Sequence, residues 1–167
     1  MNPTATNTIL SAEMVGRKLR RIALEIAENN EAETALILAG INGNGEVVVK
    51  CIQQELNKIL PISVDIATIK LNKKDPLEVS VEPKIDFNNK IIIIVDDVAN
   101  SGKTMAYALK PFLSFKPKKI QALVLVERSH KLFPVQADYV GLTIATTLQE
   151  YISVEVSGDK ILGAYLG

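Results

Sequence analysis

The stretch KIIIIVDDVANSGKT, residues 90–104, decides the fold of this chain. Its apolar run, residues 91–95, shows no alternation with polar residues and ends directly at two carboxylates, Asp96 and Asp97. An unbroken run of this length is typical of a strand that is covered on both faces, as in a parallel sheet. After a loop of small residues, the sequence predicts a helix that begins at Lys103. Because ligands of open α/β sheets bind where strands end and helices begin, we expect a binding site at this edge.

The composition predicts one soluble globular domain over residues 1–167. Hydrophobic residues make up 47% and charged residues 23%, while 19 basic residues balance 19 acidic ones. A net charge near zero and an aromatic content of 5% argue against a large surface for nucleic acid. The chain shows neither a long apolar stretch nor a secretory signal pattern, so we expect a cytoplasmic protein without a membrane partner. A single cysteine, Cys51, excludes an internal disulfide.

Strands and helices alternate along most of the chain. After a loose arm over residues 1–8, Ser11 is a candidate N-cap for a helix with an apolar stripe. Residues 72–83 form a long excursion, which we interpret as mobile or as a hairpin. Further helices are expected over residues 46–60 and 105–115, and strands over residues 35–39, 62–71, 91–95, 120–126, 138–144, 152–156 and 161–166. This order predicts an α/β fold with a mostly parallel central sheet flanked by helices and a strand-rich C-terminal end.

Three glycines follow the first predicted sheet strand, within residues 40–45. Glycine permits positive φ and a close approach of the backbone to a ligand. The spacing G-x-x-G-x-G differs from the dinucleotide-binding fingerprint G-x-G-x-x-G, so no claim for a Rossmann fold follows. A plain turn and an anion-binding loop both remain open for this segment.

The strand end and the helix start suit two different parts of one ligand. Unpaired N–H groups at a helix N-terminus attract an anion, the hydroxyl groups of Ser101 and Thr104 add donors, and Gly102 lets the backbone come close. Asp96 and Asp97 only accept hydrogen bonds, so they suit a vicinal diol or a hydrated magnesium ion. A ribose 5-phosphate satisfies both halves.

Three other interpretations compete for this stretch. The ending G-K-T resembles a Walker A loop, but that pattern requires glycine where Asp97 stands, which excludes it. A phosphoacceptor aspartate at a strand end would leave the S-G-K-T loop unexplained. A buried strand that runs into an ordinary acidic turn would explain a bare pair of aspartates, and the attached loop argues against it.

Residues 95–104, VDDVANSGKT, resemble the phosphoribosyl-pyrophosphate motif of the type I phosphoribosyltransferases. The chain as a whole is similar to a group of bifunctional proteins, each of which is both a pyrimidine operon attenuation protein and a uracil phosphoribosyltransferase. Supporting matches are the opening helix, the glycine loop, residues 126–131 (VERSHK) and residues 137–141 (ADYVG). The resemblance covers nearly the whole chain. It implies the type I phosphoribosyltransferase fold, with a flexible lid at about residues 72–83 and a small β-rich hood at about residues 127–167.

The resemblance also assigns roles to residues. The catalytic and metal-binding pair, which would hold the ribose hydroxyls and Mg²⁺, is Asp96 and Asp97. The ribose 5-phosphate would be bound by the same pair and by the loop residues Ala99, Asn100, Ser101, Gly102, Lys103 and Thr104. The pyrophosphate would face Gly40, Ile41, Asn42, Gly43 and Asn44. The base would be read by the hood residues Glu127, Arg128 and Val140.

The implied function is phosphoribosyl transfer from phosphoribosyl pyrophosphate to a nucleobase, with uracil as the expected base and a nucleotide as the product. Purine enzymes of the family carry an aspartate at the position of Asn100 and a lysine at that of Glu127, so both residues favour a pyrimidine. A homodimer or larger homo-oligomer is also implied. The alternatives are a nucleotide-sensing regulator without turnover and a purine salvage enzyme.

Further departures from the pyrimidine group affect the pyrophosphate and RNA. That group carries a threonine and an arginine where this chain has Gly43 and Asn44, so we expect weaker binding of pyrophosphate. In the lid, Lys73 and Lys74 are available to compensate. The basic positions of the group's tail correspond to Lys131, Gln136 and Leu142. Two of these three residues are uncharged, so we expect weak or absent specific binding of RNA.

Overall fold

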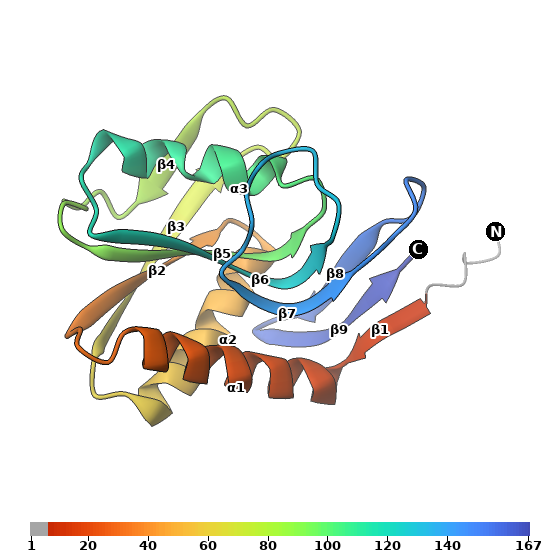
Figure 1. Cartoon of the computed structure of the whole chain (residues 1–167), viewed down its shortest axis with the longest axis horizontal. Helices are drawn as coiled ribbons and strands as arrows, with labels where there is room; N and C mark the ends of the chain where they lie inside the picture. The colour runs from red at the N-terminus through yellow and green to blue at the C-terminus, as the bar shows by residue number, and fades with distance from the viewer. Residues whose placement is uncertain (1–6) are drawn as a thin grey trace.

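The structure, a computed structural model, describes residues 7–167 and contains two sheets in this part of the chain (Figure 1). The larger sheet has six strands in the order β4-β3-β2-β5-β6-β7, and the smaller has three in the order β1-β9-β8. The strands are β1 (Asn7–Ser11), β2 (Ala35–Ile41), β3 (Ser63–Leu71), β4 (Val79–Glu82), β5 (Ile91–Ala99), β6 (Lys119–Arg128), β7 (Tyr139–Ile144), β8 (Ile152–Ser157) and β9 (Lys160–Leu166). The helices are α1 (Ala12–Asn29), α2 (Asn44–Ile59), α3 (Lys103–Ala108) and the 3₁₀ helix η1 (Lys110–Ser114).

β5 lies inside the six-stranded sheet, where it pairs in parallel with β2 and with β6. The pairs β2–β3 and β6–β7 are parallel too, whereas β4 runs antiparallel at the edge beside β3. α1 and α2 cover one face of this sheet, while α3 and η1 cover the other (Figure 1). The expected α/β fold with a mostly parallel central sheet flanked by helices is thus confirmed.

The apolar run of β5 is divided between two cores, one on each face of the sheet. Ile91, Ile93 and Val95 pack with residues of α1 and α2, whereas Ile92 and Ile94 pack with residues of α3 and η1. All five side chains are buried. Burial of one such side chain stabilises the folded state by about 1.5–3 kcal/mol, so β5 is held firmly from both faces up to its polar end.

The N-terminal segment differs in part from its predicted form. Most of the loose arm expected over residues 1–8 lies outside the described residues, but Asn7 and Thr8 belong to β1. This strand pairs antiparallel with β9, a partner that lies at the other end of the chain and that the local sequence does not indicate. The predicted N-cap of α1 is confirmed, because the Ser11 Oγ accepts a hydrogen bond from the Met14 N–H over 3.2 Å.

The single helix expected over residues 105–115 is two shorter elements instead. α3 begins at Lys103, as predicted, and the separate helix η1 follows from Lys110. Pro111 has no N–H group with which to continue the α-helical hydrogen bonds, and it stands in the first turn of η1, a position that proline tolerates. The prediction was therefore wrong in extent because a proline lies inside the predicted span.

The excursion over residues 72–83 is the end of a β-hairpin. β4 pairs antiparallel with β3, with Leu71 opposite Val79, so residues 72–78 connect the two strands. The C-terminal residues 127–167 are divided between both sheets. β7 belongs to the central sheet, while β8 and β9 form the small sheet together with β1, which lies to the right in Figure 1.

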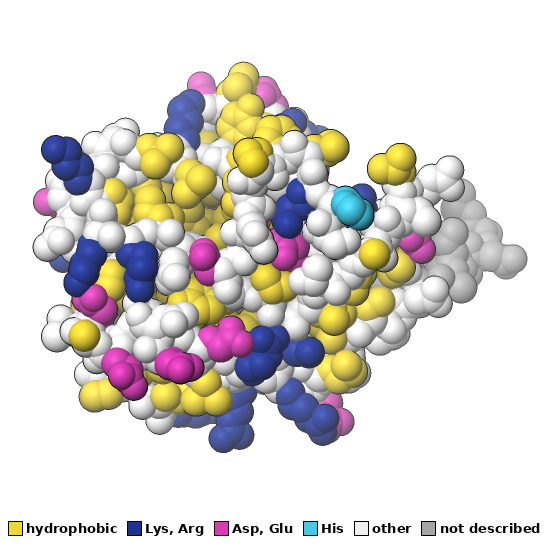
Figure 2. Space-filling view, viewed as in Figure 1, with side chains coloured by type: hydrophobic (Ala, Val, Ile, Leu, Met, Phe, Trp, Pro, Cys, Tyr) yellow, Lys and Arg dark blue, Asp and Glu magenta, His cyan; other side chains and the backbone are white. Residues whose placement is uncertain are grey.

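The surface shows no separation of charge on the face drawn in Figure 2, where basic and acidic side chains are interspersed. This agrees with the balance of charges in the sequence. None of the helices in residues 7–167 is long and apolar enough to cross a membrane.

Candidate functional site

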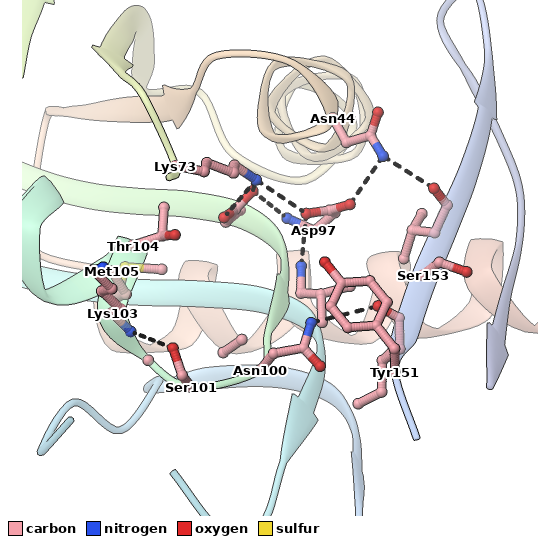
Figure 3. Close-up of a pocket in the computed structure, with 16 residues that line it drawn as sticks. Asn44, Lys73, Asp97, Asn100, Ser101, Lys103, Thr104, Met105, Tyr151 and Ser153 are labelled. Atoms are coloured by element: carbon pink, nitrogen blue, oxygen red, sulfur yellow. Dashed lines mark hydrogen bonds and ion pairs between the residues drawn. The ribbon is translucent and has the colours of Figure 1, made fainter. Parts of the chain in front are cut away.

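A cleft of about 430 Å³ opens at the C-terminal end of β5. Four parts of the chain form its walls: the end of β5 with the loop that follows it, the first residue of α2, the β3–β4 connection and the start of β8 (Figure 3). The lining residues are Asn44, Lys73, Asp96, Asp97, Val98, Ala99, Asn100, Ser101, Gly102, Lys103, Thr104, Met105, Tyr151, Ile152, Ser153 and Val154. The cleft thus brings together the two predicted carboxylates, the whole predicted loop and Asn44.

Asp96 and Asp97, called the acid pair below, contribute nearly buried carboxylates to the cleft, with exposed fractions of 2% and 8%. Each accepts a hydrogen bond from the backbone N–H of the next residue: the Asp96 Oδ1 is 2.9 Å from the Asp97 N, and the Asp97 Oδ1 is 2.8 Å from the Val98 N. The Nδ2 group of Asn44 donates to the Asp97 Oδ2 over 2.9 Å. These bonds fix the orientation of both carboxylates.

α2 approaches β5 closely because Gly45 has no side chain. A Cβ atom at this position would lie 2.8 Å from the Val95 carbonyl oxygen and 3.4 Å from the Asp96 Oδ1. The first distance is shorter than real Cβ contacts allow, so this packing requires glycine. The close approach brings Asn44, at the start of α2, within hydrogen-bond distance of Asp97.

Lys73 comes from the β3–β4 connection and places its ammonium group against the acid pair (Figure 3). Its Nζ is 3.3 Å from both carboxylate oxygens of Asp96 and 3.9 Å from the Asp97 Oδ1. Burial and the charge of Asp97 raise the pKa of Asp96 to about 8, although Lys73 opposes the shift. Burial lowers the pKa of Lys73, but the two carboxylates outweigh this effect, and the pKa lies above the ordinary value of lysine. Near neutral pH the acid pair therefore retains a proton unless a further cation joins Lys73.

Residues 99–104, called the phosphate loop below, turn from β5 into α3. Gly102 has φ +81°, in the left-handed region that favours glycine, and a Cβ atom there would also lie 3.2 Å from the Phe133 carbonyl oxygen. Behind the loop, the Ser101 carbonyl accepts hydrogen bonds from the N–H groups of Leu132 and Phe133 over 3.0 and 3.1 Å. The loop is thus held from behind, while its small residues and the first N–H groups of α3 present donors that suit an anion.

The five residues predicted to face a pyrophosphate occupy different environments. Gly40 and Ile41 are the last residues of β2 and are buried. The Asn42 Oδ1 accepts a hydrogen bond from a backbone N–H of β3 over 3.2 Å. Gly43, with φ +96°, is the N-cap of α2, which begins two positions before the predicted residue 46. Asn44 is the member of this set that lines the cleft.

The three predicted hood residues do not line the cleft. Glu127 is buried and forms an ion pair of 2.7 Å with Lys131. Arg128 lies behind the phosphate loop, where it donates hydrogen bonds to the Asn100 Oδ1, over 3.4 Å, and to a backbone carbonyl of the β7–β8 connection. The Val140 carbonyl accepts a hydrogen bond over 2.9 Å from an arginine of α1. Of the three residues, Arg128 is the one that contacts the phosphate loop, through Asn100.

Sequence reasoning missed the wall formed by residues 151–154. Tyr151 is 64% exposed beside the cleft, and the carbonyl of the next residue accepts a hydrogen bond from the Asn100 Nδ2 over 3.4 Å. The Val154 carbonyl accepts one from the Asn44 Nδ2 over 3.0 Å. The sequence holds one signal for this wall, an aromatic residue directly before an alternating strand.

Comparison with known proteins agrees with this geometry. The family model described as the phosphoribosyl transferase domain matches residues 5–157. The chain belongs to this family. Its relatives include two proteins named bifunctional protein PyrR. One, from Clostridium kluyveri, is 37% identical over 158 residues, with 89% of each chain covered. The other, from Haemophilus ducreyi, is 31% identical over 156 residues, with 87% of each chain covered.

The fold of this chain is also that of solved structures. A hypoxanthine-guanine phosphoribosyltransferase from Bacillus anthracis matches with a TM-score of 0.70 and 21% identity, covering 87% of this chain and 85% of that one. The hypoxanthine phosphoribosyltransferase of Trypanosoma cruzi matches with a TM-score of 0.74 and 16% identity, covering 83% and 82%. At these identities the likeness concerns the fold alone. The family and the fold that residues 95–104 indicated are thus confirmed.

The acid pair provides part of a possible site for a cation. Carboxylate oxygens are ligands that Mg²⁺ prefers, and an ammonium group already lies against them. Within residues 7–167, no group of three or more His, Cys, Asp or Glu side chains could hold a metal ion. Mg²⁺ commonly binds through one or two carboxylates together with phosphate oxygens of a substrate. The donors present fit that mode of binding.

Proposed function

We propose that this phosphoribosyltransferase transfers the phosphoribosyl group of phosphoribosyl pyrophosphate to uracil and releases pyrophosphate. One observation carries the proposal: the acid pair and the phosphate loop line the same cleft. Two carboxylates that only accept hydrogen bonds complement a ribose diol, and a loop of backbone donors complements its 5-phosphate. The cleft volume of about 430 Å³ lies in the range typical of small-molecule sites.

In the proposed complex, Asp96 and Asp97 accept hydrogen bonds from the ribose hydroxyls, and the phosphate loop surrounds the 5-phosphate. The hydroxyl groups of Ser101 and Thr104 add donors, and Lys103 adds a positive charge at the same end of the cleft. Mg²⁺, held by the acid pair and by substrate oxygens, would supply positive charge to the leaving pyrophosphate. The chain itself orients the ribose and keeps both ends of the donor in place.

The reaction breaks the bond between the ribose C1 and a pyrophosphate oxygen, and it forms a bond from C1 to a ring nitrogen of the base. The N–H bond of that nitrogen breaks as well, and its proton passes to the departing pyrophosphate or to water. Positive charge then develops on the ribose and negative charge on the pyrophosphate. The carboxylates of the acid pair stabilise the former, and cations around the cleft stabilise the latter. The carboxamide of Asn100 cannot take up a proton, so the proposal assigns it no role as a general base.

The start of β8 is the proposed binding wall for the base. The Tyr151 ring is exposed beside the cleft and offers a flat face for stacking (Figure 3). Ser153 lines the same wall and carries a hydroxyl group that suits the polar edge of a base. This assignment replaces the expected role of Val140, whose carbonyl is already bonded to α1.

The side chain of Asn100 favours a pyrimidine over a purine. Asn100 brings a carboxamide to the cleft at the position where purine enzymes of the family carry a carboxylate. Glu127 is buried in its ion pair with Lys131 and does not line the cleft, so its side chain adds nothing to the choice of base. The resemblance to the pyrimidine group points in the same direction.

A panel of bases tests the proposed reaction. The protein is incubated with Mg²⁺ and phosphoribosyl pyrophosphate, together with uracil, cytosine, adenine, guanine, hypoxanthine or xanthine, and the products are analysed by mass spectrometry. We expect uridine monophosphate from uracil and no nucleotide from the other bases. A nucleotide formed from a purine would instead support purine salvage. No nucleotide from any base would contradict transfer.

A second function, nucleotide binding without turnover, is favoured by one observation. The glycine loop, residues 40–45, contains no charged residue, and its Asn44 is already bonded to Asp97 and to Val154. A regulatory protein would use the same cleft to sense a nucleotide. Binding of phosphoribosyl pyrophosphate or uridine monophosphate in calorimetry, together with no product from any base, would support this second function.

RNA is not a partner in the proposed function. Lys131 aligns with a basic position of the group's tail, but its side chain is only 12% exposed and is paired with Glu127. The other two positions carry Gln136 and Leu142, which are uncharged. A homodimer or larger assembly and a cytoplasmic location stay predictions. Light scattering coupled to size-exclusion chromatography tests the first of them.

A further inference from the structure

We infer that Lys73 is a binding residue for the leaving pyrophosphate: it neutralises the acid pair in the free protein and moves to the pyrophosphate when a divalent cation joins that pair. This inference rests on the proposed function. Lys73 would supply the positive charge that the glycine loop, residues 40–45, lacks. It concerns a side chain of the β3–β4 connection, which makes no other contribution to the proposed reaction.

Lys73 lies where a cation would bind. Its Nζ is the same distance, 3.3 Å, from both oxygens of Asp96 (Figure 3). The Asp97 Oδ1 accepts a hydrogen bond from the Val98 N–H, the Asp97 Oδ2 from the Asn44 Nδ2, and the Asp96 Oδ1 from the Asp97 N–H. Among the described residues, the Asp96 Oδ2 is bonded to Lys73 alone. The distances to Lys73 exceed the 2.7–2.9 Å of strong charged hydrogen bonds, so this contact is the one most readily exchanged for a metal ion.

The cleft contains few cations that a pyrophosphate could meet. Of its 16 lining residues, Lys73 and Lys103 are the lysines, and no arginine is among them. Lys103 belongs to the phosphate loop, whereas Lys73 contacts the acid pair, against which the ribose is proposed to lie. Residues 40–45, which family resemblance places near the pyrophosphate, contain no cation. Lys73 is therefore the lining cation that lies beside the acid pair, where the ribose is proposed to bind.

The β3–β4 connection allows the Lys73 side chain to move while its backbone stays in place. The Asn72 Oδ1 accepts a hydrogen bond from the Lys74 N–H over 3.0 Å, which holds the turn. At the far end of the connection, Lys110 donates to the Leu77 carbonyl over 2.8 Å. The Lys73 side chain itself is 46% exposed, and its flexible four-carbon stem can carry the ammonium group over several ångströms. Exchange therefore needs rotation of one side chain and no opening of the loop.

Two binding measurements with opposite expected outcomes test this role. Calorimetry on the full chain measures Mn²⁺ alone in one titration and pyrophosphate in excess Mg²⁺ in the other. In Lys73→Met we expect Mn²⁺ to bind about tenfold more tightly, because a competing cation is gone. We expect pyrophosphate to bind about tenfold more weakly, because a charge-assisted hydrogen bond is lost. The matched control is Lys84→Met, since Lys84 is exposed and does not line the cleft, and both affinities should stay within about twofold of the wild type.

Pyrophosphate binding that is unchanged or tighter in Lys73→Met would overturn the inference. Equal losses in the two variants would also overturn it, because they would show a general effect of charge. Lys73→Arg keeps a cation and should retain pyrophosphate binding within about threefold. A wild-type protein that shows the expected binding but forms no nucleotide would contradict the proposed transfer and leave the role of Lys73 intact. A wild type that converts uracil, with normal pyrophosphate binding in Lys73→Met, would contradict the role of Lys73 alone.

Discussion

Asn44 and Asp97 lie 53 positions apart in the sequence and are joined by a hydrogen bond of 2.9 Å. The same Nδ2 group also donates to the Val154 carbonyl over 3.0 Å. One side chain thus connects the start of α2, the polar end of β5 and the wall formed by β8. A ligand that bonds to Asp97 would therefore meet a carboxylate whose position depends on both neighbouring walls.

Replacement of Asn44 should therefore reduce stability. In Asn44→Ala we expect the free energy of unfolding to fall by about 1–3 kcal/mol, because a bond to a charged, buried carboxylate is lost. Gln53→Ala, on the same helix, is the matched comparison, since Gln53 donates one hydrogen bond to the uncharged carbonyl of Val64. Its expected loss is about 0.5–1.5 kcal/mol. Urea denaturation at neutral pH measures both, and a larger loss in Gln53→Ala would contradict the importance of the link to Asp97.

Replacement of Asp97 should abolish binding of the donor without loss of the fold. In Asp97→Asn the affinity for phosphoribosyl pyrophosphate is expected to fall by at least about a hundredfold, because charged acceptors contribute more than neutral ones. The fold should persist, since Asp97 repels its buried neighbour Asp96. Calorimetry measures the affinity, and thermal unfolding checks the fold. The control is Asp65→Asn, on the exposed surface of β3; unchanged donor affinity in Asp97→Asn would show that this carboxylate does not contact the ribose.

Metal binding should depend on pH through Asp96. Its pKa is about 8 in the protein without ligand, and a metal ion binds the ionised carboxylate. The affinity for Mn²⁺ should thus rise by about tenfold per pH unit up to pH 8 and level off above it. Calorimetry in two buffers of different ionisation enthalpy should count about one proton released at pH 7. An affinity that does not change between pH 6 and pH 8 would contradict this prediction.

The raised pKa of Asp96 should also make the stability of the protein depend on pH. Whereas the affinity for metal rises with pH, the free energy of unfolding should fall. An unfolded chain ionises Asp96 near its ordinary value of 3.8, whereas the folded protein keeps the proton up to about pH 8. The folded state therefore binds more protons between these values, and this group lowers the free energy of unfolding as the pH rises through that window. Urea denaturation at several pH values, compared between the wild type and Asp96→Asn, measures the contribution. A wild type whose stability rises more steeply with pH than that of Asp96→Asn would refute it.

Gly102 should be sensitive to substitution for two separate reasons. Gly102→Ala would combine left-handed backbone strain with crowding against the Phe133 carbonyl, and we expect a loss of about 1–3 kcal/mol in stability. Gly158→Ala is the matched control, because its φ of +59° is also left-handed but its Cβ atom would meet nothing within 4 Å. That variant should lose about 1 kcal/mol, and it should bind ribose 5-phosphate normally. Weaker binding of ribose 5-phosphate in Gly102→Ala alone would support the assignment of the phosphate loop, and equal effects would contradict it.

Tyr151 should act on the base and not on the donor. In Tyr151→Leu the KM for uracil is expected to rise by about tenfold, since stacking of a base on an aromatic ring contributes about 1–3 kcal/mol. Tyr151→Phe keeps the ring and should behave like the wild type. Steady-state kinetics with each substrate varied in turn separates the two KM values. A rise in the KM for phosphoribosyl pyrophosphate, with the KM for uracil unchanged, would show that Tyr151 contacts the donor and not the base.

Elements of the fold could be predicted where the residues of a single segment determine its structure. The run of residues 91–95 predicts a strand buried on both faces, and the structure divides its side chains between two cores. Ser11 caps α1 as its position suggests. Pro111 also disfavours a continuous helix over residues 105–115, so the division into α3 and η1 could have been predicted from the sequence. By contrast, β1 depends on pairing with β9, which no pattern in residues 7–11 encodes.

The site could be predicted where it is continuous in the sequence. The acid pair and the phosphate loop come from one stretch, and all of their residues line the cleft. The remaining walls come from distant segments. Asn44 is 110 positions from Val154, and only packing of α2 against β5 through Gly45 brings these segments to the same place. Motif matching pointed to Val140, although the exposed aromatic residue beside the cleft is Tyr151.

The two hydrogen bonds that reach the Ser101 carbonyl from Leu132 and Phe133 have a thermodynamic consequence for ligand binding. They restrain the phosphate loop before any ligand arrives, so the loop loses little conformational entropy when an anion binds. Preorganisation of this kind increases affinity without adding a contact to the ligand. The β3–β4 connection instead presents a half-exposed side chain, that of Lys73, whose ammonium group is free to rotate. The two ends of the site should therefore differ in the entropy of binding, with the 5-phosphate end behaving as a rigid receptor and the pyrophosphate end as an adaptable one.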